Sequence, residues 1–93
     1  YLPIDKLQRA NKVKELEAVA ERHSQTQMFI ETPFRNDSIL EEVLKSCKPE
    51  TRLCIACDLT SESEFIQTKS IREWKLKIPQ LHKRPAIFLL FKK

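Results

Sequence analysis

The sequence contains no glycine among its 93 residues. An average glycine content of about 7% would place roughly six or seven in a chain of this length. Without glycine, the chain cannot form a GxGxxG turn or a P-loop, because both bring backbone that lacks a Cβ close to phosphate. If the protein uses a nucleotide-like cofactor, we expect the glycine-rich half of its binding site to lie outside this chain.

Metal-ligating residues are also scarce, with three cysteines and two histidines. Cys54 and Cys57 have CxxC spacing, but they lie in an apolar run, residues 53–57, that is typical of a strand. Residues three apart on a strand point to opposite faces and cannot chelate one ion together. The sequence therefore predicts no metal site, and it favours buried, reduced cysteines, as in a cytoplasmic protein.

The sequence has no long apolar run and no secretory signal at its start. The longest apolar run, residues 86–91, is far too short to cross a bilayer. We therefore expect a cytoplasmic protein without a membrane partner. Because the chain opens at Tyr1 inside what reads as a coherent turn, we also expect a fragment of a longer protein that forms one domain over residues 1–93.

The overall composition is typical of a folded, mildly basic domain. Hydrophobic residues make up 41% and charged residues 32%, and the net charge is +4. Such a composition is typical of a globular domain. The positive charge favours anionic partners, RNA among them, through the release of counterions.

Hydrophobic periodicity and turn residues predict seven elements in the order α-β-α-β-β-α-β. Asp5 is expected to cap the first helix, Ser70 and Glu73 to form a capping box, and Trp74 to anchor the core. The predicted ranges are a helix over 5–22, a strand over 26–30, a helix after Pro33 that ends before Pro49, strands over 52–57 and 64–68, a short helix from Ser70 to before Pro79, and a strand over 85–91.

This order predicts an α/β (α+β) fold, in which a three-layer-like domain has a mixed sheet of about four strands flanked by three helices. The first two strands are expected to run parallel through a right-handed crossover, and the third to return antiparallel. Apart from Arg52, the strands over 52–57 and 85–91 are apolar, so both are expected to be buried on both faces, the first as a central strand.

Polar residues follow the ends of the first two predicted strands. Glu31 ends one strand, with Arg35 nearby, and Asp58 ends the next, with Thr60 close behind. Because ligands bind beyond the carboxyl ends of parallel strands, this edge is a candidate site. The alternative is a set of surface turns in which Glu31 and Arg35 form an exposed ion pair.

Other charged residues leave the chemistry open. Arg9 falls on the inward arc of the first helix, near the helix start, where it either extends to the rim or points at an anion. The pair Lys83-Arg84 is interpreted as a solvated end. We recognise no nucleophile–base arrangement, so the catalytic residue is unknown at this stage.

The segments LPIDKLQR, FIETPFR, CIACDLTSESEF and PAIFLL occur in this order over almost the whole chain. Together they resemble the C-terminal half of the tetrapyrrole (corrin/porphyrin) methylase superfamily of S-adenosylmethionine-dependent methyltransferases. The nearest branch is ribosomal RNA small-subunit methyltransferase I, a family of cytidine 2′-O-methyltransferases.

This resemblance implies a two-lobed enzyme with S-adenosylmethionine in the cleft between the lobes. The glycine-rich loops belong to the N-terminal lobe of the family, which is absent from this chain, so the fragment alone is expected to be inactive. The whole enzyme is expected to be a homodimer.

The resemblance also implies site residues. Glu31, through its main chain, together with Ala56, Pro85 and Ala86, matches positions on the cofactor side. Arg9, Arg35 and Thr60 match positions that are candidates for substrate or phosphate contact.

Three departures from the family pattern leave the methyl acceptor open. Asp5 stands where the family has a lysine, the segment 57–61 lacks the arginine and lysine of a RELTK-like motif, and Pro85-Ala86 replaces a usual Gly-Glu. Pro-Ala at this point is similar to the precorrin methylases. The acceptor is thus either ribosomal RNA or a tetrapyrrole, and an alternative from another class is a non-catalytic basic α+β module that binds RNA or protein.

Overall fold

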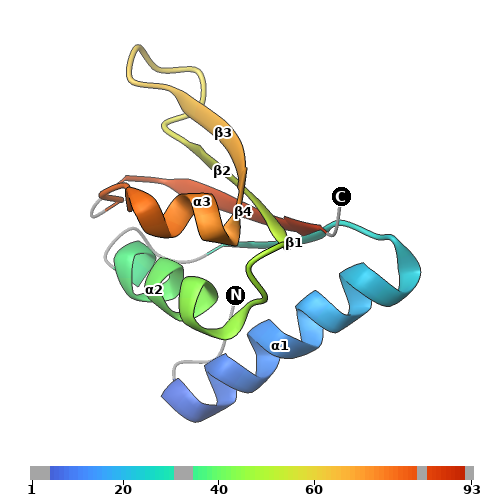
Figure 1. The fold of residues 1–93 in the computed structure, drawn as a ribbon. Helices are drawn as coiled ribbons and strands as arrows, with labels where there is room; N and C mark the ends of the chain where they lie inside the picture. The colour runs from blue at the N-terminus through green and yellow to red at the C-terminus, as the bar shows by residue number, and fades with distance from the viewer. Residues whose placement is uncertain (1–4, 31–34, 82–83, 92–93) are drawn as a thin grey trace.

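The helices and strands lie close to their predicted positions in the computed structural model, which describes residues 5–30, 35–81 and 84–91. The elements are α1 (Lys6–His23), β1 (Gln27–Ile30), α2 (Asn36–Ser46), β2 (Arg52–Cys57), β3 (Phe65–Ser70), α3 (Ile71–Leu76) and β4 (Ala86–Phe91). The predicted element order is confirmed (Figure 1).

The predicted caps account for where two helices begin. The Asp5 carboxylate accepts hydrogen bonds from the backbone N–H groups of Leu7 and Gln8 at the start of α1. At α3, Ser70 and Glu73 form the reciprocal capping box. Both caps satisfy N–H groups that the first helical turn leaves without a partner, so the local sequence fixes these starts.

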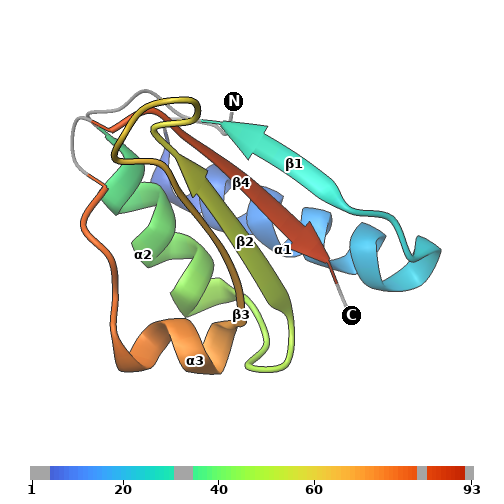
Figure 2. The ribbon, with the colours of Figure 1, turned by 90° about the horizontal axis from the view of Figure 1, so that it is seen from above.

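The sheet is antiparallel throughout, with strand order β1-β4-β2-β3 (Figure 2). The expected mixed sheet is therefore wrong in its pairing. β1 and β2 do run in the same direction, but the apolar strand β4 lies between them and pairs with both. The predicted antiparallel return of β3 beside β2 is confirmed. Strand order follows from which apolar faces pack best, and periodicity carries no information on that choice.

All three helices pack on one face of the sheet, so the fold has two layers and the expected third layer is wrong (Figure 1). One core cluster joins inward side chains of the strands to side chains of each helix. The inward strand residues are Phe29, Leu53, Ile55, Cys57, Ala86, Phe88 and Leu90. A single face can supply this set because alternate residues of a strand point the same way.

Within the described residues, no helix covers the second face of the sheet, which we call the open face. β4 alternates between buried and half-buried residues, so the expectation that it is buried on both faces is wrong: Ile87, Leu89 and Phe91 lie on the open face. β2 is buried on both faces apart from Arg52, as predicted. The open face also carries Met28 and Ile66, both exposed.

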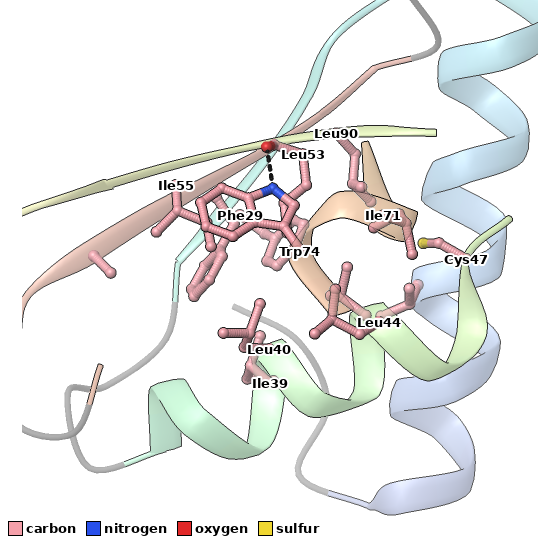
Figure 3. Close-up of a cluster of buried hydrophobic side chains, with 14 of the residues drawn as sticks. Phe29, Ile39, Leu40, Leu44, Cys47, Leu53, Ile55, Ile71, Trp74 and Leu90 are labelled. Atoms are coloured by element: carbon pink, nitrogen blue, oxygen red, sulfur yellow. Dashed lines mark hydrogen bonds between the residues drawn. The ribbon is translucent and has the colours of Figure 1, made fainter. Parts of the chain in front are cut away.

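Trp74 is the anchor of the core beneath β2 and β3. Its side chain is buried, and its indole N–H donates a hydrogen bond of 2.8 Å to the Leu53 carbonyl (Figure 3). Phe29 and Phe88 stack with ring centroids 5.3 Å apart. The prediction that Trp74 serves the core is confirmed.

A buried carboxylate, which the sequence did not indicate, fixes α1 to the segment before β2. Glu17 is 7% exposed and accepts hydrogen bonds from the Lys48 backbone N–H at 2.7 Å and the Thr51 hydroxyl at 2.5 Å. Burial, together with Glu17, raises the pKa of the Cys47 thiol to about 12. Glu17 is thus a buried charge with its hydrogen-bond donors supplied by the fold.

The three cysteines are free and buried, as predicted. Cys57 points into the core and Cys54 to the open face, as expected for strand residues three apart. Within residues 5–30, 35–81 and 84–91, no three histidine, cysteine or acidic side chains are placed to hold a metal ion together. No helix in the described part of the chain has both the length and the apolar character needed to span a membrane.

Candidate functional site

The candidate site is a concavity of about 460 Å³ where β1 and β2 end and β4 begins. We call it the strand-end site. Its lining consists of Ile30, Ala56, Asp58, Leu59, Ser61, Pro85, Ala86 and Ile87. The ladder brings these segments together, because Cys57 lies opposite Ala86, and Ile30 opposite Ile87. The volume falls in the range of small-molecule sites, about 300–1,000 Å³.

Three of the four residues assigned to the cofactor side lie together in this site. Ala56, Pro85 and Ala86 all line it, although Ala56 and Ala86 are 30 residues apart in the sequence. Glu31 lies outside the described residues, directly after the lining residue Ile30. The small side chains of Ala56 and Ala86 leave open space above the strands at this point.

The residues assigned to the acceptor are placed differently from one another. Thr60 is exposed and lies between Leu59 and Ser61, both of which line the site. Arg35 is half-buried and immediately precedes α2. Its expected ion pair with Glu31 falls on a residue outside the described part of the chain.

Arg9 is not part of the strand-end site. It is 7% exposed and lines a separate hollow of about 110 Å³ between α1 and α2. Glu41 and Glu42 line the same hollow. Two carboxylates beside a buried guanidinium favour a structural contact between the helices over the binding of an anion there.

An ion pair that the sequence did not indicate holds one wall of the strand-end site. Arg84 Nε lies 2.7 Å from Asp58 Oδ2, and their side chains are 34% and 15% exposed. Arg84 also donates a hydrogen bond to the Ser63 carbonyl at 3.2 Å. The hydrogen bond with Asp58 raises the pKa of Arg84, so the guanidinium stays charged. The interpretation of Arg84 as a solvated end is therefore wrong.

The loop over residues 58–64 adopts a strained backbone in this glycine-free chain. Asp58 and Thr60 have φ of 53° and 65°, in the left-handed region. Aspartate tolerates this region, whereas a β-branched threonine does so at a cost. Hydrogen bonds hold the loop, including Thr60 N–H to Glu64 Oε1 at 2.8 Å and Ser61 Oγ to the Asp58 carbonyl at 2.7 Å.

The start of α2 holds Leu81 and Arg84, which precede the lining residue Pro85 in the sequence. The buried Asn36 amide donates hydrogen bonds to the carbonyls of Leu81 and Arg84, and Asp37 Oδ1 accepts one from the Leu81 N–H at 2.8 Å. The segment that leads into β4 is thus fixed before Pro85 reaches the site. Asn36 and Arg84 carried no motif, so only their contacts reveal this role.

We expect Arg84→Gln to loosen the loop over residues 58–64 without unfolding the domain. Loss of the ion pair and the bond to Ser63 should lower local stability by about 1 kcal/mol, since the pair is partly exposed. Amide hydrogen exchange at Ser61 and Glu64 measures the change, because their N–H groups bond within the loop. Arg72→Gln is the matched control, since Arg72 pairs with Glu50 at 3.2 Å on the surface. Equal exchange in both variants would contradict the role of Arg84.

Comparison with solved structures shows that this fold is similar to part of a known enzyme. The chain superimposes on the methyltransferase CobJ with a TM-score of 0.52 and 17% sequence identity, over 88% of this chain and 35% of that chain. The chain has the fold of one part of CobJ. At 17% identity the likeness shows the fold alone, and the chain spans about a third of the length of that enzyme. No protein-family model and no curated protein matches the sequence.

Proposed function

We propose that this chain is the C-terminal lobe of an S-adenosylmethionine-dependent methyltransferase of the tetrapyrrole methylase superfamily, in which the cofactor lies between two lobes. The observation that carries the proposal is the strand-end site, which gathers Ala56, Pro85 and Ala86 from two strands into one concavity. The motif resemblance named these residues from the sequence alone. The shared fold with part of the methyltransferase CobJ supports the same assignment.

The residues of the strand-end site fit the adenosine part of such a cofactor. A planar base needs flat apolar walls and few polar groups, and the walls here are mostly alanine, proline, leucine and isoleucine. The polar lining residues are Asp58 and Ser61. When bound, the cofactor supplies a methyl group on a sulfonium that is attacked in line by the acceptor.

The chain contributes positioning to this reaction. Ala56 and Ala86 admit the ring against the strands, while Leu59 and Ile87 exclude water from it. The Asp58–Arg84 pair keeps Leu59 in place. Because in-line displacement depends strongly on orientation, holding one reactant in a fixed pose accounts for a large part of such catalysis.

For the full-length protein we propose ribosomal RNA as the methyl acceptor, with a ribose 2′-hydroxyl as the group that is methylated. The support is the order of the motifs, which is closest to the ribosomal RNA branch. Arg35 and Thr60 are the candidates for contact with the acceptor. Arg9 lines a separate hollow, and we propose no contact between it and the acceptor. The tetrapyrrole alternative is supported by Pro85-Ala86, and radiolabelled cofactor offered with either substrate to the full-length protein separates the two.

The proposal predicts weak but local binding of the cofactor by this chain. Titration with S-adenosylmethionine should shift the backbone amide signals of Ile30, Leu59 and Ala86, with a Kd on the order of 1 mM because the chain supplies only one wall. Ala56→Leu should abolish these shifts by filling the site. Ala18→Leu, a half-buried alanine on α1, is the matched control and should leave them unchanged.

Two results would count against this proposal. If S-adenosylmethionine shifts no amide signals at the strand-end site, the proposal that this site binds the cofactor is wrong. Micromolar binding by this chain alone would contradict the account in which a second lobe completes the pocket.

A further inference from the structure

A second concavity lies on the helix side of the edge strand β3, and we call it the β3 notch. It measures about 240 Å³ and is lined by Phe65, Gln67, Lys69, Trp74, Lys77 and Pro79. None of these residues lines the strand-end site. α3 follows β3 directly and lies beside it at the edge of the sheet (Figure 2). Its residues all lie within the continuous stretch 65–79, and no motif in the sequence pointed to this site.

The walls of the β3 notch are flat and apolar. Phe65 and Pro79 are half-buried, so each keeps a surface open to a ligand. Trp74 forms the floor, with its ring centroid 6.3 Å from that of Phe65 and the two planes tilted by 59°. Aromatic and proline side chains in this arrangement offer a stacking surface to a planar ring.

The rim of the β3 notch is positively charged. Lys69 Nζ lies 4.9 Å above the indole ring of Trp74, an attractive contact for the ammonium, and Lys77 lines the same hollow. No carboxylate lines the notch. Among the described residues, neither lysine forms an ion pair, so both charges remain available to a ligand.

The surface around the β3 notch extends this charge. Lys75 is exposed on α3 and adds to this charge, while Arg72 on the same helix is paired with Glu50. The neighbouring acids are already engaged, Glu73 in the capping box and Glu50 with Arg72. Hydrogen bonds with Ser70 lower the pKa of Glu73, and Arg52 and Lys69 add smaller contributions, which places both cations close to this helix start.

We propose that the β3 notch binds single-stranded nucleic acid, with one base against Phe65 and Pro79 and the flanking phosphates at Lys69 and Lys77. Basic groups interleaved with a stacking surface are the combination that such strands require. Gln67 adds a hydrogen-bonding group beside the base. Along the described part of the chain, β3 pairs only with β2, so its second edge remains open beside the bound strand.

The loop over residues 58–64 connects this notch to the strand-end site. Asp58, Leu59 and Ser61 line the strand-end site, and Phe65, directly after the loop, lines the β3 notch. The two hollows are thus joined by a short stretch of chain. The proposal stands on the notch itself and does not depend on methyl transfer.

Trp74 is the single tryptophan of the chain, so its fluorescence reports on the β3 notch. We expect titration with an eight-nucleotide uridine RNA, or the matching DNA, to change this fluorescence in a saturable way. Uridine monophosphate, which provides one base without flanking phosphates on both sides, should bind at least tenfold more weakly. The double variant Lys69→Gln/Lys77→Gln should lower the affinity at least tenfold and reduce the salt slope by roughly 1.4, at about 0.7 per lost phosphate contact.

Two controls separate this site from general charge attraction. Lys12→Gln/Lys14→Gln on α1 removes the same charge at a distance from the notch and should change the affinity less than twofold. Phe65→Leu keeps an apolar side chain but removes the ring, and should weaken binding roughly fivefold if a base stacks there. Circular dichroism of each variant shows that the fold is retained.

Three outcomes would overturn the proposal. These are unchanged Trp74 fluorescence at saturating nucleic acid, equal losses in the two lysine pairs, and equal affinity for the oligonucleotide and for a polyphosphate of similar charge. Because the readout is binding by this chain, the result does not depend on cofactor binding. A positive result with no amide shifts at the strand-end site would leave the nucleic-acid site standing and reject the methyltransferase assignment.

Discussion

Trp74→Ala is expected to lower the free energy of unfolding by about 3–5 kcal/mol, the usual cost of truncating a buried aromatic side chain. Trp74 is 1% exposed and packs where β2, β3 and α3 meet (Figure 3). A small domain has only about 5–15 kcal/mol of stability in total. Urea unfolding followed by circular dichroism at 25 °C measures the loss, since the variant has no tryptophan fluorescence.

Trp74→Phe separates the packing of this residue from its hydrogen bond. Phenylalanine keeps most of the apolar volume but cannot donate to the Leu53 carbonyl, so we expect a smaller loss of about 1–2 kcal/mol. Leu76→Ala on the same helix is the control, because Leu76 is 84% exposed and should change the free energy of unfolding by less than about 0.5 kcal/mol. A loss of similar size in Trp74→Ala and Leu76→Ala would show that α3 does not belong to the cooperative core.

Glu17→Ala is expected to cost about 2–4 kcal/mol of unfolding free energy. The substitution removes the acceptor of the Lys48 N–H and the Thr51 hydroxyl and leaves both donors in a partly or fully buried place. Both bonds are accepted by Oε2, so the amide oxygen of Glu17→Gln can still accept them, more weakly than a carboxylate, and the loss should be about 1 kcal/mol. Glu15→Gln is the control, since the surface pair of Glu15 with Lys12 at 3.5 Å contributes little.

The Cys47 thiol provides a second readout of the same contact. Burial is the largest cause that raises its pKa, and the charge and hydrogen bond of Glu17 add to it. Together they raise the pKa to about 12. Glu17→Gln should lower this pKa and speed the reaction of Cys47 with a thiol reagent above pH 8. The native thiol holds its proton more tightly than an unfolded one, so the free energy of unfolding should fall as the pH rises from about 9 toward about 12. Unchanged thiol reactivity in Glu17→Gln would contradict the contact.

The elements of the fold were predictable because their signals are local. The capping groups Asp5 and Ser70 and the stop at Pro49 each act within one helical turn, and the observed helices begin and end near them. β2 coincides with its predicted range because a short apolar run, residues 53–57, bounded by turn residues is typical of a strand buried on both faces. The grouping of Ala56, Pro85 and Ala86 was also anticipated, through a resemblance in motifs.

The features missed by sequence reasoning depend on partners far apart in the chain. Glu17 meets Thr51 across 34 positions, and Arg84 meets Asp58 across 26. Glu17 lies four residues after Val13 and three before Ala20, on the apolar side of α1, but this spacing does not reveal that Thr51 is its partner. The β3 notch is an exception in sequence distance, since its residues lie within 65–79, and it forms only when α3 folds back on β3 and brings Trp74 close to Phe65.

The sequence by itself determined the order and type of the elements, the absence of any glycine-dependent phosphate loop, and the small side chains available at the strand ends. Tertiary structure decided that β4 separates β1 from β2, that the helices share one face, and that Arg84 is a structural partner of Asp58. The physical reason is that capping and periodicity are fixed by neighbours a few residues away. Strand order and ion pairing are decided instead by which distant surfaces gain most when they are buried together.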